Sequence, residues 1–133
     1  MKISSKGRYA VRVMADIATQ NKEYVSLSEI AERQNISVKY LEKIVSLLSK
    51  SGLLTSMMGS LGGYRLSKRP EEISVGDILL STGDMPELAP CMADGKCESS
   101  GTCMAIGVWE NLSKLIYEFL TNLSLKDIVD KKL

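Results

Sequence analysis

Apolar residues near the start of the chain recur at helical spacing. Five of them fall at positions i, i+3, i+4, i+7 and i+8, on one face of a helix: Ala10, Val13, Met14, Ile17 and Ala18. This spacing predicts an amphipathic helix whose apolar face packs into a core. We expect this helix to be the scaffold for the elements that follow.

Two more helices and a tight turn are predicted between residues 26 and 52. Ser26 with Glu29 three residues later is a capping-box signature for a short helix that ends near Gln34. Ser37 is a good N-cap for the next helix, which runs to Ser51-Gly52. Its apolar positions repeat at helical spacing: Leu41, Ile44, Val45 and Leu48. Two short helices joined by a tight turn predict a helix-turn-helix.

A β-hairpin is predicted directly after the helix-turn-helix. Two short apolar runs in LLTSMMGSLGGYRL flank a glycine-rich tip at 59–63, which is typical of a hairpin turn. A hairpin in this place is the wing of a winged helix. Ser74 with Asp77 then caps another short helix through about Leu80.

The last third of the chain combines an irregular segment with a long helix. Residues 83–102 follow neither the helix nor the strand period, and such a long segment is usually functional or disordered. A broad apolar stripe then predicts a helix from Met104 of about five turns. The stripe comprises Ala105, Val108, Trp109, Leu112, Leu115, Ile116, Phe119 and Leu123. Because the winged helix has faces for its own core, we expect the stripe to meet the same helix of a second subunit. Ser124 with Asp127 caps a final turn.

The predicted fold class is mainly α with a small β-hairpin wing. Three regions form one compact unit: a winged helix-turn-helix DNA-binding region at 1–70, a connecting helix and cysteine loop at 71–103, and a dimerisation helix with a C-terminal turn at 104–133. A chain of 133 residues suits one such unit. No apolar run approaches the roughly twenty residues that span a bilayer, so no membrane association is predicted.

Charge is divided unevenly along the chain, although the net charge is only +1. Residues 1–69 hold 12 Lys and Arg against 5 Asp and Glu, whereas residues 70–133 hold 5 against 11. A basic half beside an acidic half predicts a polyanion-binding surface at one end, although a solvated charged surface without a ligand is the alternative. The helix-turn-helix favours double-stranded DNA as the polyanion.

Three evenly spaced cysteines supply the candidate chemistry. Cys91, Cys97 and Cys103 form C-x5-C-x5-C in a polar, glycine-dotted segment, and thiolates are the usual ligands of iron–sulfur clusters. The odd count argues against a closed disulfide set, and without an N-terminal signal segment we expect a cytoplasmic location with reduced thiols. A zinc or thiol-oxidation switch and unliganded structural thiols are the alternatives. The chain has no histidine, which excludes Ser/His and Cys/His catalysis, and we predict no enzyme activity.

The order of these motifs resembles a known family. The segments that carry the resemblance run along essentially the whole chain: KISSKGRYAVRVM, SLSEIAERQNISVKYLEKIVSLLSKSGLL, GGYRLSK, ISVGDIL and the triple cysteine loop. Together they look like an Rrf2-family winged-helix regulator of the IscR-like, cluster-binding type. The resemblance implies a homodimeric repressor of iron–sulfur cluster biogenesis or related redox genes, in which a cluster modulates promoter binding. The alternatives are nitric oxide sensing, or control of cysteine metabolism through a protein partner; a cluster-assembly protein is another candidate partner.

The resemblance assigns the three cysteines to a cluster, with 2Fe-2S favoured over 4Fe-4S, but the family's fourth ligand does not map. The IscR type uses a histidine three residues after the last cysteine, where this chain has Ile106. The NsrR type uses an N-terminal aspartate, where this chain has Arg8. The remaining candidates are a small exogenous thiol, water, or one of four carboxylates: Asp84, Asp94, Glu98 and Glu110.

The predicted DNA contacts fall in three groups. The N-terminal segment, which resembles the family's phosphate-clamping stretch, contributes Lys2, Ser4, Lys6, Arg8 and Tyr9. The helix-turn-helix contributes Ser28, Ser37, Val38, Lys39, Tyr40, Glu42 and Lys43. The wing contributes Gly59, Ser60 and Arg65. Hydroxyls and cations in these groups suit phosphate, and the two lysines of the second helix can also read guanine.

Glu42 and the wing tip stand out among these residues. Phosphate repels a carboxylate, so Glu42 either accepts from a cytosine amino group or pairs with Ser46 or Lys39 along the helix. In the family the matching glutamate is associated with choosing between promoter classes. The wing tip carries Met58, Ser60 and Leu61 where the cluster-type regulators commonly place an arginine. We therefore expect minor-groove readout to be weaker or to fall to Arg65.

Overall fold

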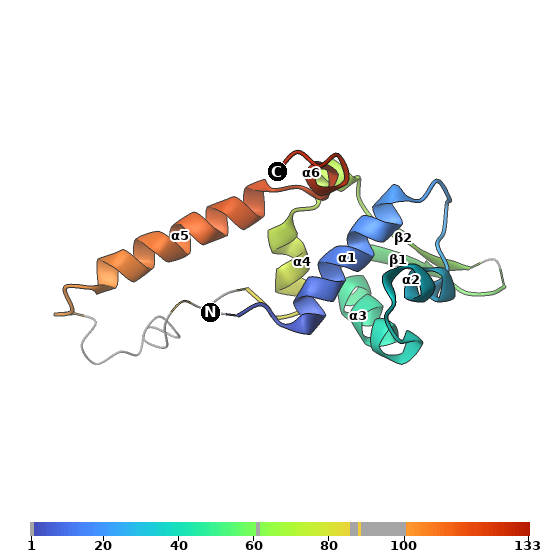
Figure 1. The fold of residues 1–133 in the computed structure, drawn as a ribbon, viewed down its shortest axis with the longest axis horizontal. Helices are drawn as coiled ribbons and strands as arrows, with labels where there is room; N and C mark the ends of the chain where they lie inside the picture. Colours follow the sequence, from blue (N-terminus) through green and yellow to red (C-terminus); the bar gives the residue numbers. More distant parts are fainter. Residues whose placement is uncertain (1, 61, 86–87, 89–100) are drawn as a thin grey trace.

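The computed structural model of the protein describes residues 2–60, 62–85, 88 and 101–133. Six α-helices, one 3-10 helix and a two-stranded antiparallel sheet occupy the described part of the chain (Figure 1). In chain order they are α1 (Ser5–Thr19), α2 (Leu27–Gln34), α3 (Val38–Lys50), β1 (Leu54–Met57), β2 (Gly63–Leu66), η1 (Pro70–Glu72), α4 (Val75–Ser81), α5 (Ile106–Asn122) and α6 (Leu125–Val129). The predicted winged-helix fold class is confirmed; η1 was not foreseen.

Serine side chains start five of the helices. Each accepts a hydrogen bond from the backbone N–H three residues ahead, which satisfies one of the unpaired donors of the first turn. The serines are Ser4, Ser26, Ser37, Ser74 and Ser124. Reciprocal capping boxes form at the three starts where one was predicted, before α2, α4 and α6. The three predicted starts are confirmed. They could be predicted because a cap and its partner lie within four residues of each other.

The helix-turn-helix is closed by a left-handed residue. Asn35 caps the C-terminus of α2 with φ of 53°, a conformation that asparagine tolerates better than most residues. The Ile36 N–H then donates to the Ala31 carbonyl at 3.1 Å, and its side chain is buried. This turn fixes the angle at which α3 leaves α2.

The wing is the predicted hairpin. Strands β1 and β2 pair in register from Leu54 opposite Leu66 to Met57 opposite Gly63. Val25 bridges to Tyr64, with N···O distances of 2.8 and 2.9 Å, so the chain before α2 adds a third short edge. Leu54 is buried at the root of the hairpin, which joins the wing to the core.

One principal core holds the DNA-binding half together. It combines the predicted faces of α1 and α3 with residues from the other elements: Ala10, Val13, Met14, Ile17, Val25, Ile30, Leu41, Ile44, Val45, Leu48, Ile73, Ile78 and Leu125. A smaller cluster of Val75, Leu79 and Leu120 packs α4 against the end of α5. The C-terminal segment is therefore part of the same folded unit as the winged helix.

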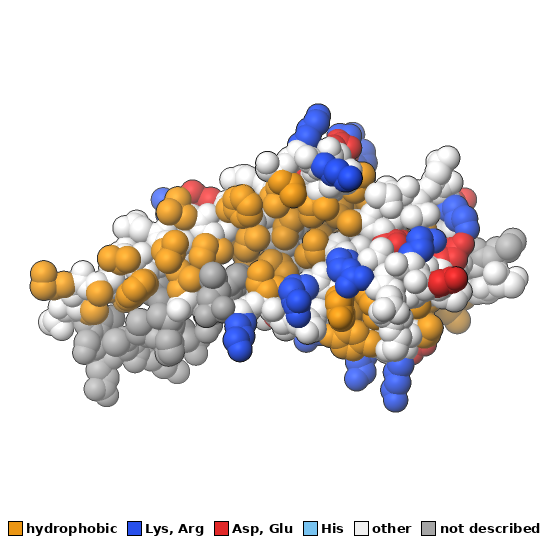
Figure 2. Space-filling model, in the orientation of Figure 1, with side chains coloured by type: hydrophobic (Ala, Val, Ile, Leu, Met, Phe, Trp, Pro, Cys, Tyr) orange, Lys and Arg blue, Asp and Glu red, His pale blue; other side chains and the backbone are white. Residues whose placement is uncertain are grey.

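Helix α5 extends away from this unit and leaves its apolar stripe uncovered (Figures 1 and 2). Leu120, near its C-terminus, is its one buried residue. Val108, Leu115 and Phe119 are 57–64% exposed, far more than the residues of the core. A contiguous exposed apolar surface of this kind is typical of an interaction site. The end of α5 is fixed by pairing between the caps of α4 and α6: Val75 N donates to Leu123 O and Leu125 N to Ile73 O, both at 2.8 Å.

No helix in the described ranges has the length and apolar character needed to cross a bilayer.

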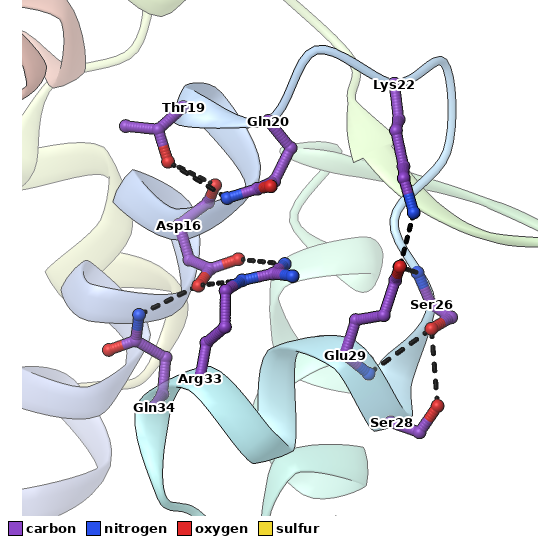
Figure 3. A network of polar contacts seen from close by, with 9 residues as sticks. All are labelled: Asp16, Thr19, Gln20, Lys22, Ser26, Ser28, Glu29, Arg33 and Gln34. Atoms are coloured by element: carbon purple, nitrogen blue, oxygen red, sulfur yellow. Dashed lines mark hydrogen bonds and ion pairs between the residues drawn. The ribbon is translucent and has the colours of Figure 1, made fainter.

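A buried carboxylate ties α1 to the helix-turn-helix (Figure 3). Asp16, whose side chain is 2% exposed, accepts two hydrogen bonds from the Arg33 guanidinium at 2.8 and 3.0 Å. Gln34 Nε2 donates to the same carboxylate at 2.8 Å. No local pattern in the sequence predicts this network, because Asp16 is 17 and 18 residues away from its two partners.

Replacing Asp16 should destabilise the fold strongly. Asp16→Ala leaves Arg33 and Gln34 without their shared acceptor, and we expect a loss of about 2–3 kcal/mol in the free energy of unfolding. Asp130→Ala is the matched control, because it breaks only an exposed pair with Lys126 and should cost less than about 0.5 kcal/mol. Urea denaturation followed by circular dichroism measures both. Equal midpoints for the two variants would contradict the assigned role of Asp16.

Candidate nucleic-acid interface and cysteine segment

Helix α3 presents a polar face at its N-terminal end. Its apolar side is buried in the core, which turns Val38, Lys39, Glu42 and Lys43 outward, and all four are exposed. Ser37 Oγ accepts from Tyr40 N at 3.2 Å, so this serine fixes the helix start while its own hydroxyl hydrogen is free to donate. The arrangement suits entry into a major groove, where the first turns of a recognition helix reach base edges.

Glu42 stands apart from the other charges of α3. Neither of its expected intrahelical partners, Ser46 or Lys39, makes a hydrogen bond or ion pair with it in the described part of the chain. Its carboxylate is exposed beside Lys39 and Lys43. This geometry leaves Glu42 available to a ligand.

Tyr40 is less available to DNA than its neighbours. It is half-buried, with its ring edge-on to Tyr9 of α1 at a centroid distance of 5.8 Å. Arg12 stacks over the Tyr9 ring at 5.0 Å and donates to the Gln34 carbonyl at 2.5 Å. Arg12 therefore connects the turn of the helix-turn-helix to the two tyrosines. Arg12 was not among the predicted site residues, although its position three residues after Tyr9 places both on one helix face.

The N-terminal segment makes an unforeseen contact with Asp84, which precedes the three cysteines in the chain. Ser4 Oγ donates to Asp84 Oδ2 at 2.6 Å and Ser4 N donates to Oδ1 at 3.2 Å. A Cβ on Gly7 would lie 2.7 Å from that carboxylate, so glycine allows the close approach. Burial favours a raised pKa for Asp84, but hydrogen bonds from Ser4 and Thr82 and the charge of Lys6 outweigh it and lower the pKa.

This contact changes the roles available to the predicted phosphate clamp. The Ser4 hydroxyl already serves Asp84, whereas Lys2 and Arg8 are exposed and Lys6 is half-buried. Among the described residues, the Arg8 side chain donates one local hydrogen bond, to Ser5 Oγ at 3.1 Å. The cations of this segment therefore keep donors for phosphate. Figure 2 shows basic side chains along the side of the body where Figure 1 places α3 and the start of α1.

A hollow of about 520 Å³ separates the wing from the two helices of the helix-turn-helix. Its lining is rich in small polar residues and also includes two methionines: Ser26, Leu27, Ser28, Val38, Ser56, Met57, Met58, Gly59, Ser60, Gly62, Gly63 and Tyr64. The predicted contacts Ser28, Gly59 and Ser60 therefore meet at one place. Ser28 Oγ lies 3.3 Å from Ser26 Oγ at the start of α2 (Figure 3).

The capping carboxylate of α2, Glu29, accepts a hydrogen bond from the backbone of Ser26, which lines this hollow. Hydrogen bonds from Lys22 and from the backbone and hydroxyl of Ser26 lower the pKa of Glu29 to about 2. Glu29 therefore stays ionised well into acidic pH. The Glu29 carboxylate is paired with Lys22 and accepts from the backbone at the helix start. Its charge is therefore largely neutralised and adds little repulsion toward a polyanion.

Arg65 faces the base of the wing. Its guanidinium lies 3.6 Å from Glu23 and stacks over Tyr24 at 5.0 Å. These contacts hold the side chain near the loop that precedes α2. A reach into the minor groove would require Arg65 to leave both partners.

Of the three cysteines, the structure describes Cys103, whereas Cys91 and Cys97 lie outside the described residues. Cys103 is half-buried and forms no disulfide within the described ranges, and its backbone carbonyl accepts a hydrogen bond from Ile106 N at the start of α5. No three Cys, Asp or Glu side chains gather as a metal site among the described residues. Three thiolates nevertheless form a soft donor set that fits iron and sulfide.

The structure describes two of the four carboxylates that are candidates for the fourth ligand. Asp84 is engaged by Ser4, and Glu110 is exposed on α5 two turns after Cys103. Asp94 and Glu98 lie outside the described residues. An Asp84 ligand would have to give up its contact with the first turn of α1.

The chain matches a family model described as Rrf2, iron-dependent transcriptional regulator, over residues 3–131. The transcriptional regulator IscR of Pectobacterium atrosepticum is 39% identical over 99% of this chain and 81% of its own length. IscR of Vibrio vulnificus is 39% identical over 97% and 77%. Two solved structures superimpose closely. CymR, the global cysteine regulator of B. subtilis, has a TM-score of 0.79 with 32% identity over 98% of both chains, and T. potens IscR has 0.78 with 35% identity over 100% and 89%.

Proposed function

Because the chain belongs to the Rrf2 family, it is a DNA-binding transcriptional regulator rather than an enzyme, and we propose that it represses iron–sulfur cluster biogenesis or related redox genes. In this proposal it acts as a homodimer whose operator binding responds to an iron–sulfur cluster on Cys91, Cys97 and Cys103. The observation that carries it is the position of Cys103 directly before the N-terminus of α5, next to the exposed apolar stripe. We place this activity in the cytoplasm.

Double-stranded DNA would meet α3, the start of α1 and the wing on one side of the body. Lys39, Lys43, Lys6 and Arg8 supply charge for phosphate, and the exposed first turns of α3 supply base contacts. When bound, the cluster would supply a centre whose assembly and loss follow iron and oxidant supply. The protein's own contribution is to link that segment, through Asp84, to the first turn of α1.

The salt dependence of binding tests the electrostatic part of this proposal. Lys6→Ala should weaken binding to every sequence alike and reduce the slope of log affinity against log salt by about one unit, because one phosphate contact is lost. Lys126→Ala on α6 is the matched control and should leave the slope unchanged. Fluorescence anisotropy over a series of salt concentrations measures both. Wild-type affinity that is indifferent to salt would contradict the proposal.

Glu42 should determine sequence choice more than strength. Glu42→Ala removes the acceptor for a cytosine amino group and the repulsion toward other bases, so binding should relax at one base-pair position by about 1–3 kcal/mol. Selection from a randomised duplex pool with wild type and variant measures the change in consensus. The same consensus from both proteins would leave Glu42 as an ordinary surface residue.

A second candidate function is control of cysteine metabolism without a cluster. The close superposition on CymR, a global cysteine regulator, favours it. Iron and sulfide analysis of protein purified without oxygen separates the two, because only the first proposal requires both elements.

A further inference from the structure

The tip of the wing is apolar and exposed. Met58 is 94% exposed and Met57 is 48% exposed. The sequence from Met57 to Gly63 contains no charged residue, and the next cation, Arg65, is held by Glu23 and Tyr24. A contact between this tip and DNA therefore cannot depend on charge.

Glycines fix the shape of the tip. Gly59 has φ of 110°, and Gly62 N donates to its carbonyl at 3.0 Å. A Cβ on Gly62 would lie 2.1 Å from the Met57 carbonyl oxygen, and one on Gly63 would lie 2.3 Å from that of Val25. These approaches are closer than any side chain allows, so only glycine fits at residues 62 and 63, and Met58 stays exposed beside them.

The tip also shares a hollow with the recognition helix. Met58 and Val38 both line the space of about 520 Å³, together with Ser26 and Ser28 at the start of α2. A duplex that receives α3 in its major groove would run its sugar–phosphate strand through this hollow. The next surface along the duplex, under the wing tip, is the flanking minor groove.

We propose that Met58 enters the minor groove beside each half-site as an apolar wedge and thereby selects deformable base steps. Apolar side chains of this kind, methionine included, insert between base steps and partly unstack them. Pyrimidine–purine steps such as TA and CA are the easiest to open, so sequence is read there through deformability. The inference rests on the DNA-binding function and adds a specificity determinant to it.

The test uses the duplex recovered by the wild-type protein from a randomised pool. Met58→Ala should bind it about tenfold more weakly, since apolar burial is lost, with an unchanged salt slope. Met58→Arg should steepen that slope by about one unit. Leu133→Ala, which removes an apolar side chain that is 86% exposed elsewhere on the protein, is the matched control and should match wild type. The exposure of Met58 makes misfolding of these variants a minor concern, and circular dichroism checks it.

A local probe distinguishes a wedge from simple contact. 2-Aminopurine, whose fluorescence rises on unstacking, is placed at successive positions flanking each half-site. Wild type and Leu133→Ala should raise the signal at one step, and Met58→Ala should not. Equal affinity and equal fluorescence for Met58→Ala would overturn the wedge, as would a loss of affinity with a shallower salt slope. A wild-type protein that retains no duplex would instead overturn the DNA-binding function.

Discussion

Leu115→Glu should convert the protein to a monomer and reduce operator affinity by about 100-fold or more, because a dimer holds two half-sites with one binding event. Leu115 is 62% exposed in the middle of the α5 stripe, and a carboxylate there would be buried without a partner if two such helices met. A hollow of about 370 Å³ continues this apolar surface between α1, α4 and the end of α5. Figure 2 shows hydrophobic side chains running from α5 onto the body at this place.

Sedimentation equilibrium at micromolar concentration measures the oligomeric state, and anisotropy measures the affinity. Lys114→Glu is the matched control, because it introduces the same side chain one residue earlier on the polar side of α5. It should remain dimeric and bind DNA, apart from a small change in salt dependence. A dimeric Leu115→Glu protein would show that subunits meet elsewhere.

Cys103→Ala should abolish visible absorbance and protein-bound iron and sulfide in protein purified without oxygen. A cluster needs its thiolate ligands, and a loss of one from three leaves too few to hold it. The same variant should keep its dimer and its fold, because Cys103 is only half-buried. Met104→Ala is the matched control, since Met104 is fully exposed and next in the chain.

The DNA arm of this experiment tests whether the cysteines form the switch. Affinity for cluster-dependent operators should change in Cys103→Ala, and affinity for other operators should not. If the triple alanine variant binds every operator as cluster-loaded wild type does, control by a protein partner replaces the cluster proposal. Iron without sulfide, or zinc alone, would favour the simpler metal switch.

Local signals in the sequence predicted most of the fold. The starts of α2, α3, α4 and α6 depend on a serine and on groups within four residues, and all are confirmed. The long-range contacts were not predictable in the same way. Ser4 and Asp84 are 80 residues apart, and neither carries a local sign that they meet.

In the candidate site, too, the features set by local sequence were predicted and those set by contacts between elements were not. Periodicity identified the exposed face of α3, since the buried face of a helix fixes the opposite one. It did not reveal that Tyr40 packs on Tyr9 or that Arg65 is held at the base of the wing, because both depend on neighbouring elements. The assignment of Cys91, Cys97 and Cys103 to a cluster stays a prediction.

The pairing of the α4 and α6 caps makes the end of α5 a pivot. The helix has 17 residues, which corresponds to a length of about 25 Å, so a rotation of about 5° at the pivot moves its far end by about 2 Å. Beyond Leu120 and toward Cys103, no described residue of α5 is buried against its own body. A small rotation at the fixed C-terminal end of α5 therefore produces its largest displacement at the other end, next to Cys103. A displacement there can reach α1 through α4, because Val75, Leu79 and Leu120 pack α4 against α5 and Val11 of α1 packs against the same cluster.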